Sequence, residues 1–444
     1  MSRQFFGTDG IRGRVGEHPL TAEFALRLAS AAARVLAPGG GRVVIGKDTR
    51  VSGYMFESAL EAGFVAAGMD VALLGPLPTP GIAYMTQASQ ADLGVVISAS
   101  HNPYFDNGIK FFDRKGGKLS DSIEAAIEAR LGEPAITRES GALGRAKRLE
   151  SAIEQYQRFC ISTVSGGLRL DGLKVVVDCA HGAGYKVAPR TLAELGAEII
   201  PIGCSPNGRN INDGCGSTHP DLLTLMVKGV GADIGIAFDG DGDRVLMVDH
   251  LGKLVDGDQI LYVLAADRGR RGLLEGPVVG TLMSNLGLEL ALGELGAGFC
   301  RARVGDRYVL ELLRETGGQL GGEASGHILC LDKTTTGDGL VTALQVLAVM
   351  KDSGRNLADL VGGMVRFPQV LINVRMARRV DVDSSLPVRS AVEAVERHLG
   401  RRGRVVLRPS GTEPVVRVMV EGEDEGEVRH LAEQIARAVA AEAA

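Results

Sequence analysis

The sequence predicts an α/β protein: three similar α/β domains, each on a mostly parallel sheet, and a smaller α+β domain at the C-terminus. The chain has 444 residues, a length typical of about three or four domains. Short apolar strands alternate with helical patterns in three successive rounds, and the C-terminal segment breaks this alternation. Strands that alternate with helices favour right-handed crossovers and sheets covered on both faces.

The three rounds follow one plan, although their sequences are not repeats of each other. The first has strands RVVIG (42–46), DVALLG (70–75) and LGVVIS (93–98), with a helix expected around residues 55–67. The second has strands KVVVD (174–178), AEIIPIG (197–203) and DIGIAF (233–238), and the third has PVVGTL (277–282), GFCRARV (298–304) and GQLGGEASGH (318–327).

The C-terminal segment differs from these rounds. RVVLRPSGTEPVVRVMVEGED predicts two strands around a turn, and residues 427–444 form an amphipathic helical pattern. Pro368 marks a linker near residue 367, because proline interrupts both helices and ladders. We therefore expect four domains, which span residues 1–160, 161–256, 257–367 and 368–444.

Composition excludes several classes of protein. The net charge is −5, from 49 basic and 54 acidic residues, which argues against a general nucleic-acid binder. No stretch approaches 18 consecutive apolar residues and the N-terminus has no signal-peptide pattern, so we expect a cytoplasmic protein without a membrane span. The six cysteines lack CxxC spacing and are expected to be reduced packing residues. Glycine is frequent, with 61 residues at many strand ends, which suggests loops that approach ligands closely.

One loop predicts a metal site. Asp239, Asp241 and Asp243 recur at a spacing of two directly after an apolar strand, with glycines between them. Three carboxylates with open positions suit a hard cation such as Mg²⁺, whose other ligands are water or phosphate. A calcium-binding EF-hand is excluded because no helix precedes the loop and His250 stands where the bidentate glutamate belongs.

A second loop carries two serines. LGVVIS ends in Ser98-Ala99-Ser100-His101-Asn102-Pro103. A serine beside a histidine suggests nucleophilic catalysis, but the GxSxG elbow is absent. Neighbouring side chains on an extended strand also point to opposite faces. On a continuing strand Ser98 and Ser100 would share one face. A serine near a metal loop suits phosphoryl transfer better than acyl transfer.

Other loops are weaker signals. Arg408-Pro409-Ser410-Gly411-Thr412-Glu413-Pro414 exposes backbone N–H groups beside Arg408 and Arg417, which could bind phosphate or form an ordinary hairpin turn. Glu323, Ser325 and His327 in GEASGH could bind sugar hydroxyls, and His327 could move a proton. The glycine loops GTDGIRG (7–13) and GKDTR (46–50) each place a basic residue beside a turn.

SASHNP, DGDGDR, GEASGH and RPSGTEP occur in this order, one in each predicted domain, and together they resemble the α-D-phosphohexomutase superfamily over essentially the whole chain. FGTDGIRG and NINDGCGSTHP (210–220) are similar to its bacterial branch that interconverts glucosamine 6-phosphate and glucosamine 1-phosphate. The resemblance implies four domains around a central cleft. It also implies an isomerase whose product supplies UDP-N-acetylglucosamine and cell-wall precursors.

The resemblance further implies residue roles. Ser100 would carry a phosphoryl group and, with the three aspartates, would hold one Mg²⁺. Glu323 and Ser325 would bind sugar hydroxyls. The reaction would pass through a sugar 1,6-bisphosphate. The non-reacting phosphate would be held by Arg408, Ser410, Gly411, Thr412 and Arg417.

Phosphoryl transfer depends mainly on alignment and on neutralising the charge of the moving group. Lys110 and Arg244 are cations for that purpose, and the residues that could transfer a proton are Arg12, His101, Lys110 and His327. A phosphoglucomutase or phosphomannomutase of the same superfamily is the alternative activity. A metal-dependent phosphatase leaves Ser100 without a role, and a non-catalytic phosphosugar sensor would be expected to lose the serine or an aspartate. By analogy the partners are a phosphosugar and a second copy of the chain.

Overall fold

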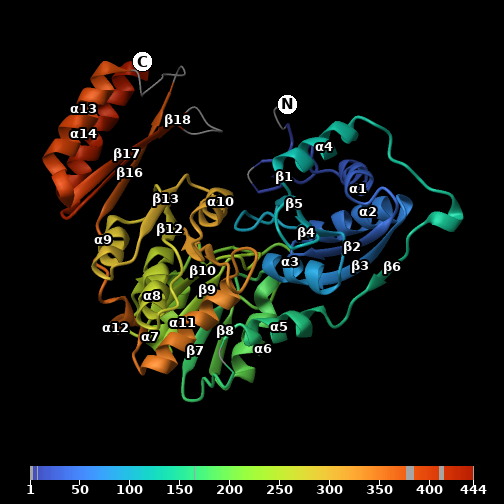
Figure 1. Ribbon diagram of the computed structural model, residues 1–444, viewed down its shortest axis with the longest axis horizontal. Helices are drawn as coiled ribbons and strands as arrows, with labels where there is room; N and C mark the ends of the chain where they lie inside the picture. The colour runs from blue at the N-terminus through green and yellow to red at the C-terminus, as the bar shows by residue number, and fades with distance from the viewer. Residues whose placement is uncertain (1–3, 8, 165, 377–384, 410–414, 444) are drawn as a thin grey trace.

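The architecture is taken from a computed structural model that describes residues 4–7, 9–164, 166–376, 385–409 and 415–443. Three mixed sheets with helices and one antiparallel sheet follow each other along the chain (Figure 1). Among the described residues, no helix is both long and apolar enough to cross a membrane. Three short 3₁₀ helices are Ser140–Ala142, Ala183–Tyr185 and Gly400–Arg402.

The first sheet has the order β1-β5-β4-β2-β3-β6, in which β1, β5 and β4 pair antiparallel and the remaining pairs are parallel. Both faces are buried: Val43 and Ile45 pack on the side of α1 and α2, and Val44 packs with Ile82 of α3. The strands are β1 Ile11–Arg14, β2 Gly41–Lys47, β3 Met69–Pro76, β4 Leu93–Ile97, β5 Asp106–Asp113 and β6 Ala146–Arg148; the helices are α1 Ala22–Leu36, α2 Ser52–Ala66, α3 Thr79–Ala88 and α4 Asp121–Leu131.

The second sheet has the order β11-β10-β9-β7-β8. β7 is parallel to β8 and β9, whereas β9 and β10 form an antiparallel hairpin in which Phe238 pairs with Val245. The acidic loop is therefore the turn of this hairpin. The elements are β7 Lys174–Asp178, β8 Glu198–Ile202, β9 Ile234–Phe238, β10 Val245–Asp249, β11 Leu254–Val255, α5 Ala152–Ser162, α6 Val187–Glu194 and α7 Asp221–Val230.

The third sheet has the order β13-β12-β14-β15, with an antiparallel pair only between β14 and β15. One hydrophobic core continues from the first sheet through the second to α11, so the three α/β units pack as neighbours. The elements are β12 Val278–Thr281, β13 Phe299–Ala302, β14 Leu320–Gly322, β15 Ile328–Cys330, α8 Gly257–Arg270, α9 Leu286–Glu294, α10 Asp306–Thr316, α11 Gly339–Ser353 and α12 Leu357–Val361.

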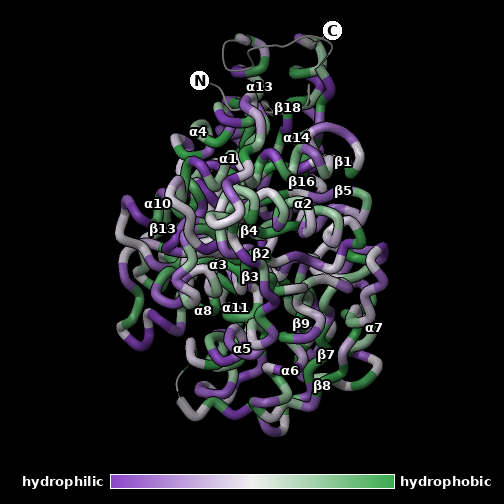
Figure 2. The backbone as a smooth tube through the Cα atoms, turned by 90° about the vertical axis from the view of Figure 1, so that its right-hand side faces the viewer, coloured by the Kyte–Doolittle hydropathy of each residue, from purple (hydrophilic) through white to green (hydrophobic). Residues whose placement is uncertain are grey.

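The C-terminal unit is an antiparallel sheet of order β16-β18-β17 with two helices and its own core. It lies at the top of the molecule, with α13 and α14 beside its strands (Figure 2). The predicted hairpin and terminal helix are confirmed, and the structure adds β16 and α13. The elements are β16 Gln369–Arg375, β17 Gly403–Pro409, β18 Val415–Gly422, α13 Leu386–Leu399 and α14 Glu425–Ala443.

The acidic turn between β9 and β10 contacts the first residues of α3 and α11. Thr79 at the start of α3 donates its backbone N–H to the carbonyl of Asp241 at 2.8 Å, and Gly339 at the start of α11 donates to the carbonyl of Gly242 at 3.1 Å. The acidic turn is therefore held by helix starts from two other parts of the chain.

Candidate active site

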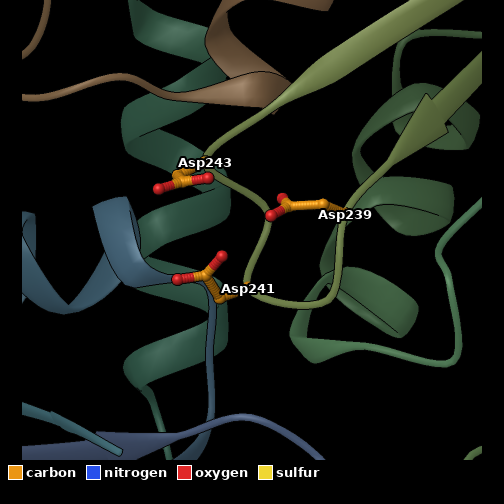
Figure 3. A group of neighbouring side chains, drawn as sticks. All are labelled: Asp239, Asp241 and Asp243. Carbon is orange, nitrogen blue, oxygen red and sulfur yellow. The ribbon is translucent and has the colours of Figure 1, made fainter. Parts of the chain in front are cut away.

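The acidic turn forms a buried carboxylate cluster. One oxygen from each of Asp239, Asp241 and Asp243 lies within 4.8 Å of the others (Figure 3). Gly242 has φ +71°, a left-handed conformation that glycine adopts easily, and this lets the turn reverse within the hairpin. The predicted grouping of the three carboxylates is thus observed.

The cluster has the properties of a cation site. Among the described residues, Asp241 Oδ1 and Asp243 Oδ1 are buried without a hydrogen-bond partner. Burial, together with the charges of Asp243 and Asp241, raises the pKa of Asp239 well above its usual value. Three hard oxygen donors and two orphaned oxygens fit Mg²⁺, which would offset the mutual repulsion of the carboxylates.

Lys110 on β5 supplies a fixed positive charge beside the cluster. Its Nζ lies 2.9 Å from carboxylate oxygens of both Asp241 and Asp9. Thr79 Oγ1 donates to Asp241 at 2.6 Å. Burial alone would raise the pKa of Asp241, but Lys110 and these hydrogen bonds outweigh it and hold that pKa far below its usual range. Asp241 therefore stays ionised, as a metal ligand must.

Ser100 reaches the acidic turn from the first α/β unit. Its Oγ donates to Asp239 Oδ2 at 2.6 Å, although the two residues lie 139 positions apart in the chain. The strand alternation expected for Ser98 and Ser100 does not apply, because β4 ends at Ile97 and Ser100 adopts φ +51°. Ser98 instead accepts a hydrogen bond from the backbone N–H of Ser100 at 2.9 Å and so helps to shape the loop.

His101 lies closer to the serine than extended geometry predicts. Its Nδ1 is 3.4 Å from Ser100 Oγ, because the left-handed turn removes the alternation that would separate neighbouring side chains. Burial and then Arg244 and Arg12 lower the pKa of His101 to about 4. The imidazole is thus neutral at pH 7 in this arrangement.

His327 and Arg244 flank the cluster from the other side. His327 Nδ1 lies 3.5 Å from Asp243 and its Nε2 lies 3.7 Å from Asp306. Burial by itself would lower the pKa of His327, but Asp243 and Asp306 outweigh it and raise that pKa to about 9. Arg244 Nε lies 3.8 Å from Asp243, and its backbone N–H donates to Asp239 at 3.2 Å.

A cavity of about 320 Å³ opens beside these residues. It is lined from three α/β units and includes both cations and carboxylates, as expected of a site for a charged, polar ligand. Glu323 accepts the backbone N–H of Gly305 at 3.0 Å, and Ser325 in the same loop is exposed. The lining residues are Gly7, Asp9, Gly10, Arg12, Asp243, Arg244, Gly305, Asp306, Glu323 and His327.

The predicted phosphate loop belongs to the C-terminal unit. Arg408 on β17 pairs directly across the ladder with Arg417 on β18, so the two arginine side chains start from neighbouring positions of the sheet. Neither lines the cavity described above. Ser410, Gly411 and Thr412 lie outside the described residues.

Sequence reasoning missed three charged residues of the site. Asp9 forms ion pairs with Arg12, Lys110 and Lys118, and Lys118 also pairs with Asp306 of α10. Asp9 stands within the glycine loop GTDGIRG, which was a usable signal. Lys118 and Asp306 follow no spacing rule, because only the packing of two units makes them neighbours.

Comparisons with known proteins cover the whole chain. Models of the phosphoglucomutase/phosphomannomutase family match residues 3–135 (α/β/α domain I), 154–252 (domain II), 256–367 (domain III) and 371–438 (C-terminal domain). A phosphoglucosamine mutase of Aeromonas hydrophila is 57% identical over 440 residues, which are 99% of each chain.

Solved structures share the fold. A phosphoglucomutase/phosphomannomutase family protein of Burkholderia thailandensis has a TM-score of 0.83 at 25% identity, over 99% of this chain and 98% of that one. Aspergillus fumigatus N-acetylphosphoglucosamine mutase, solved in complex with GlcNAc-6P and magnesium, has a TM-score of 0.69 at 18% identity, over 100% and 96% of the two chains.

Proposed function

Because the chain belongs to the phosphoglucomutase/phosphomannomutase family of phosphohexomutases, we propose that it is a phosphoglucosamine mutase, an isomerase that interconverts glucosamine 6-phosphate and glucosamine 1-phosphate. The observation that carries the chemistry is the contact between a serine hydroxyl and a buried acidic turn: Ser100 Oγ lies 2.6 Å from Asp239. A phosphatase that relied on the three aspartates alone would leave this serine without a role.

Asp239, Asp241, Asp243 and the phosphorylated Ser100 would hold one Mg²⁺. When bound, the cation would neutralise negative charge on the transferring phosphoryl group. Lys110 and Arg244 add fixed positive charge on either side of the turn, where they oppose the charge that develops in the transition state.

In the proposed cycle, the bond between phosphorus and Ser100 Oγ breaks as a bond forms from phosphorus to a hydroxyl of the sugar phosphate. The proton of that hydroxyl passes to a neighbouring base. Arg12, His101, Lys110 and His327 stay the candidates for proton transfer: the lowered pKa of His101 leaves it unprotonated and able to accept, whereas the raised pKa values of Arg12, Lys110 and His327 leave them protonated and able only to donate. The resulting 1,6-bisphosphate turns over and returns its other phosphoryl group to Ser100, so the phosphoserine is regenerated.

The remaining contacts orient the substrate. Glu323 lines the cavity and could pair with the ammonium at C2, and Ser325 in the same loop would bind a hydroxyl. Arg408, Ser410, Gly411, Thr412 and Arg417 would hold the phosphate that does not react. The position of Arg408 opposite Arg417 supports this, because two adjacent guanidinium groups suit the oxygens of one phosphate.

The choice among sugar phosphates tests the proposed activity. A coupled assay on the purified protein should give a higher kcat/KM with glucosamine phosphate than with glucose or mannose phosphate, since the site must read the group at C2. A higher kcat/KM with glucose 1-phosphate would instead make the protein a phosphoglucomutase of the same family.

The phosphoserine has its own test. Ser100→Ala should lose the phosphoryl mass from the purified protein and nearly all mutase activity. Ser98→Ala should keep the phosphoryl mass and part of the activity, because Ser98 only shapes the loop. Tryptic mass spectrometry of the peptide that contains both serines measures this, and phosphate on Ser98 or an active Ser100→Ala enzyme would contradict the assignment.

We also propose the domain boundaries 160/161, 256/257 and 367/368; each sheet lies within one of the resulting ranges, which supports them, but the first boundary falls inside α5 (Ala152–Ser162) and so divides that helix. A cytoplasmic location and a homodimer stay predictions. Sedimentation of the purified protein would measure the second.

A further inference from the structure

The loop that carries Ser100 is held by side chains that the proposed reaction does not use. Ser100 adopts φ +51°, a region that residues with a Cβ seldom occupy unless their surroundings impose it. In this conformation its Oγ donates to Asp239 at 2.6 Å. Something must therefore keep the backbone of residues 100–102 in place when phosphoryl groups arrive and leave.

Two donors from different units bind the same two carbonyls of that loop. Nη2 of Arg50 donates to the carbonyl oxygens of Ser100, at 3.1 Å, and of Asn102. Nδ2 of Asn212 donates to the same oxygens at 2.9 and 3.2 Å. Arg50 belongs to GKDTR and Asn212 to NINDGCGSTHP, two motifs that the catalytic assignment left without a role.

Arg50 is itself fixed. Its side chain is fully buried and forms an ion pair with Asp48, which also accepts a hydrogen bond from Ser98 Oγ. Because Ser98 in turn accepts the N–H of Ser100, the four residues form a closed ring of hydrogen bonds. A planar guanidinium with several donors suits this position, whereas a lysine ammonium could not reproduce the geometry.

Asn212 connects the ring to the acidic turn. Its backbone is also left-handed, with φ +59°, and its N–H donates to the carbonyl of Ala180 at 2.9 Å. A Cβ at Gly240, inside the acidic turn, would lie 2.7 Å from both the Ser100 carbonyl oxygen and Asn212 Nδ2. The serine loop, Asn212 and the acidic turn are thus packed against one another without space between them.

We infer that Arg50 and Asn212 are positioning residues that clamp the Ser100 loop from two sides and keep the serine aimed at the metal-binding turn. The inference rests on the proposed phosphoserine mechanism. Since neither residue lines the cavity, loosening the clamp should slow phosphoryl transfer and leave sugar binding nearly unchanged.

Asn212 is the better residue to change, because removal of Arg50 would leave Asp48 charged and buried and could unfold the protein. Asn212→Asp keeps the shape and the left-handed preference but places an acceptor opposite two carbonyl oxygens. Asn212→Gly keeps the backbone conformation and removes the amide. Gln90→Gly is a matched control at an exposed position with φ +51°.

The measurements are kcat and KM for glucosamine 1-phosphate, the Tm, and the phosphoryl mass on Ser100. We expect kcat to fall at least about tenfold for Asn212→Asp and less for Asn212→Gly, which retains Arg50, with KM within about twofold and Gln90→Gly like the wild type. A kcat within about twofold of wild type in both Asn212 variants, or a loss that appears only in KM, overturns the inference. A wild-type enzyme that never carries phosphate on Ser100 overturns the proposed function, and this inference with it.

Discussion

At the scale of single residues, neutral and charged neighbours give three similar aspartates different properties. Asp239 faces Ser100, Asp241 pairs with Lys110, and Asp243 lies between Arg244 and His327. Burial, together with the charges of the other two aspartates, raises the pKa of Asp239, whereas Lys110 holds that of Asp241 down. A divalent cation at the acidic turn would therefore offset the repulsion that remains among the three carboxylates.

Asp241→Asn and Asp243→Asn should each reduce mutase turnover by about a hundredfold or more, because each removes a ligand and a negative charge from the site. The fold should survive, since an amide has nearly the same volume. Mg²⁺ titration by calorimetry and the Mg²⁺-dependent rise in Tm measure the loss directly. Asp213→Asn, at an exposed position, is the control. Wild-type Mg²⁺ affinity in either variant would remove the metal assignment.

At the scale of elements, the buried carboxylate of Asp258 connects the start of α8 to the start of α9. Asp256 caps α8 and accepts the N–H of Gln259 at 3.1 Å. Asp258 accepts the N–H of Asn285, the N-cap of α9, at 2.8 Å. Burial and then the charge of Asp256 raise the pKa of Asp258 from its ordinary value of 3.8 to about 7.

A raised pKa means that folding favours protonated Asp258. Its contribution to stability is complete below about pH 4 and is lost as pH rises through about 7, on the order of a few kcal/mol. Asp258→Asn has no charge to bury, so its Tm should exceed that of the wild type increasingly between pH 4 and pH 8. Calorimetric scans across that range measure the difference, with the exposed Asp221→Asn as control. A Tm difference independent of pH would contradict the argument.

At the scale of the whole molecule, the C-terminal unit has its own core and is joined to the third α/β unit by a few polar contacts. Glu421 on β18 is fully buried; it accepts the N–H of Leu286 at 2.7 Å and the Nε of Arg404 at 2.7 Å. Arg404 also donates to the carbonyl of Leu282 at 2.8 Å. These contacts attach the sheet that carries Arg408 and Arg417 to the third α/β unit.

Glu421→Gln should loosen the attachment of the C-terminal unit, because the loss of one partner from a buried ion pair costs about 3–5 kcal/mol. We expect trypsin to cut several-fold faster after the exposed Arg366 in the connecting segment. KM for the sugar phosphate should rise as well. Glu423→Gln, two positions away and exposed, is the matched control. Equal cleavage rates for wild type and Glu421→Gln would show that this ion pair does not hold the unit.

The sequence by itself determined what depends on neighbours along the chain. Strand β9 and its acidic turn follow from an apolar run that ends in DGDGDR, and the alternation of strands and helices follows from hydrophobic periodicity. Period and turn chemistry are local properties, and local signals survive in any fold that contains these elements. The C-terminal hairpin was predictable for the same reason, whereas β16 and α13 carried weaker patterns.

Only the tertiary structure decided which of these local features meet. The left-handed backbone at Ser100 could not be predicted, because the residue is not a glycine. It exists because Arg50 and Asn212 hold the loop. Lys118 and Asp306 are 188 residues apart and become partners only when two units pack. The physical reason is that a charged side chain buried by packing needs a partner of opposite charge, and the packing decides which residue that partner is. That packing depends on the whole core and not on any stretch of the sequence.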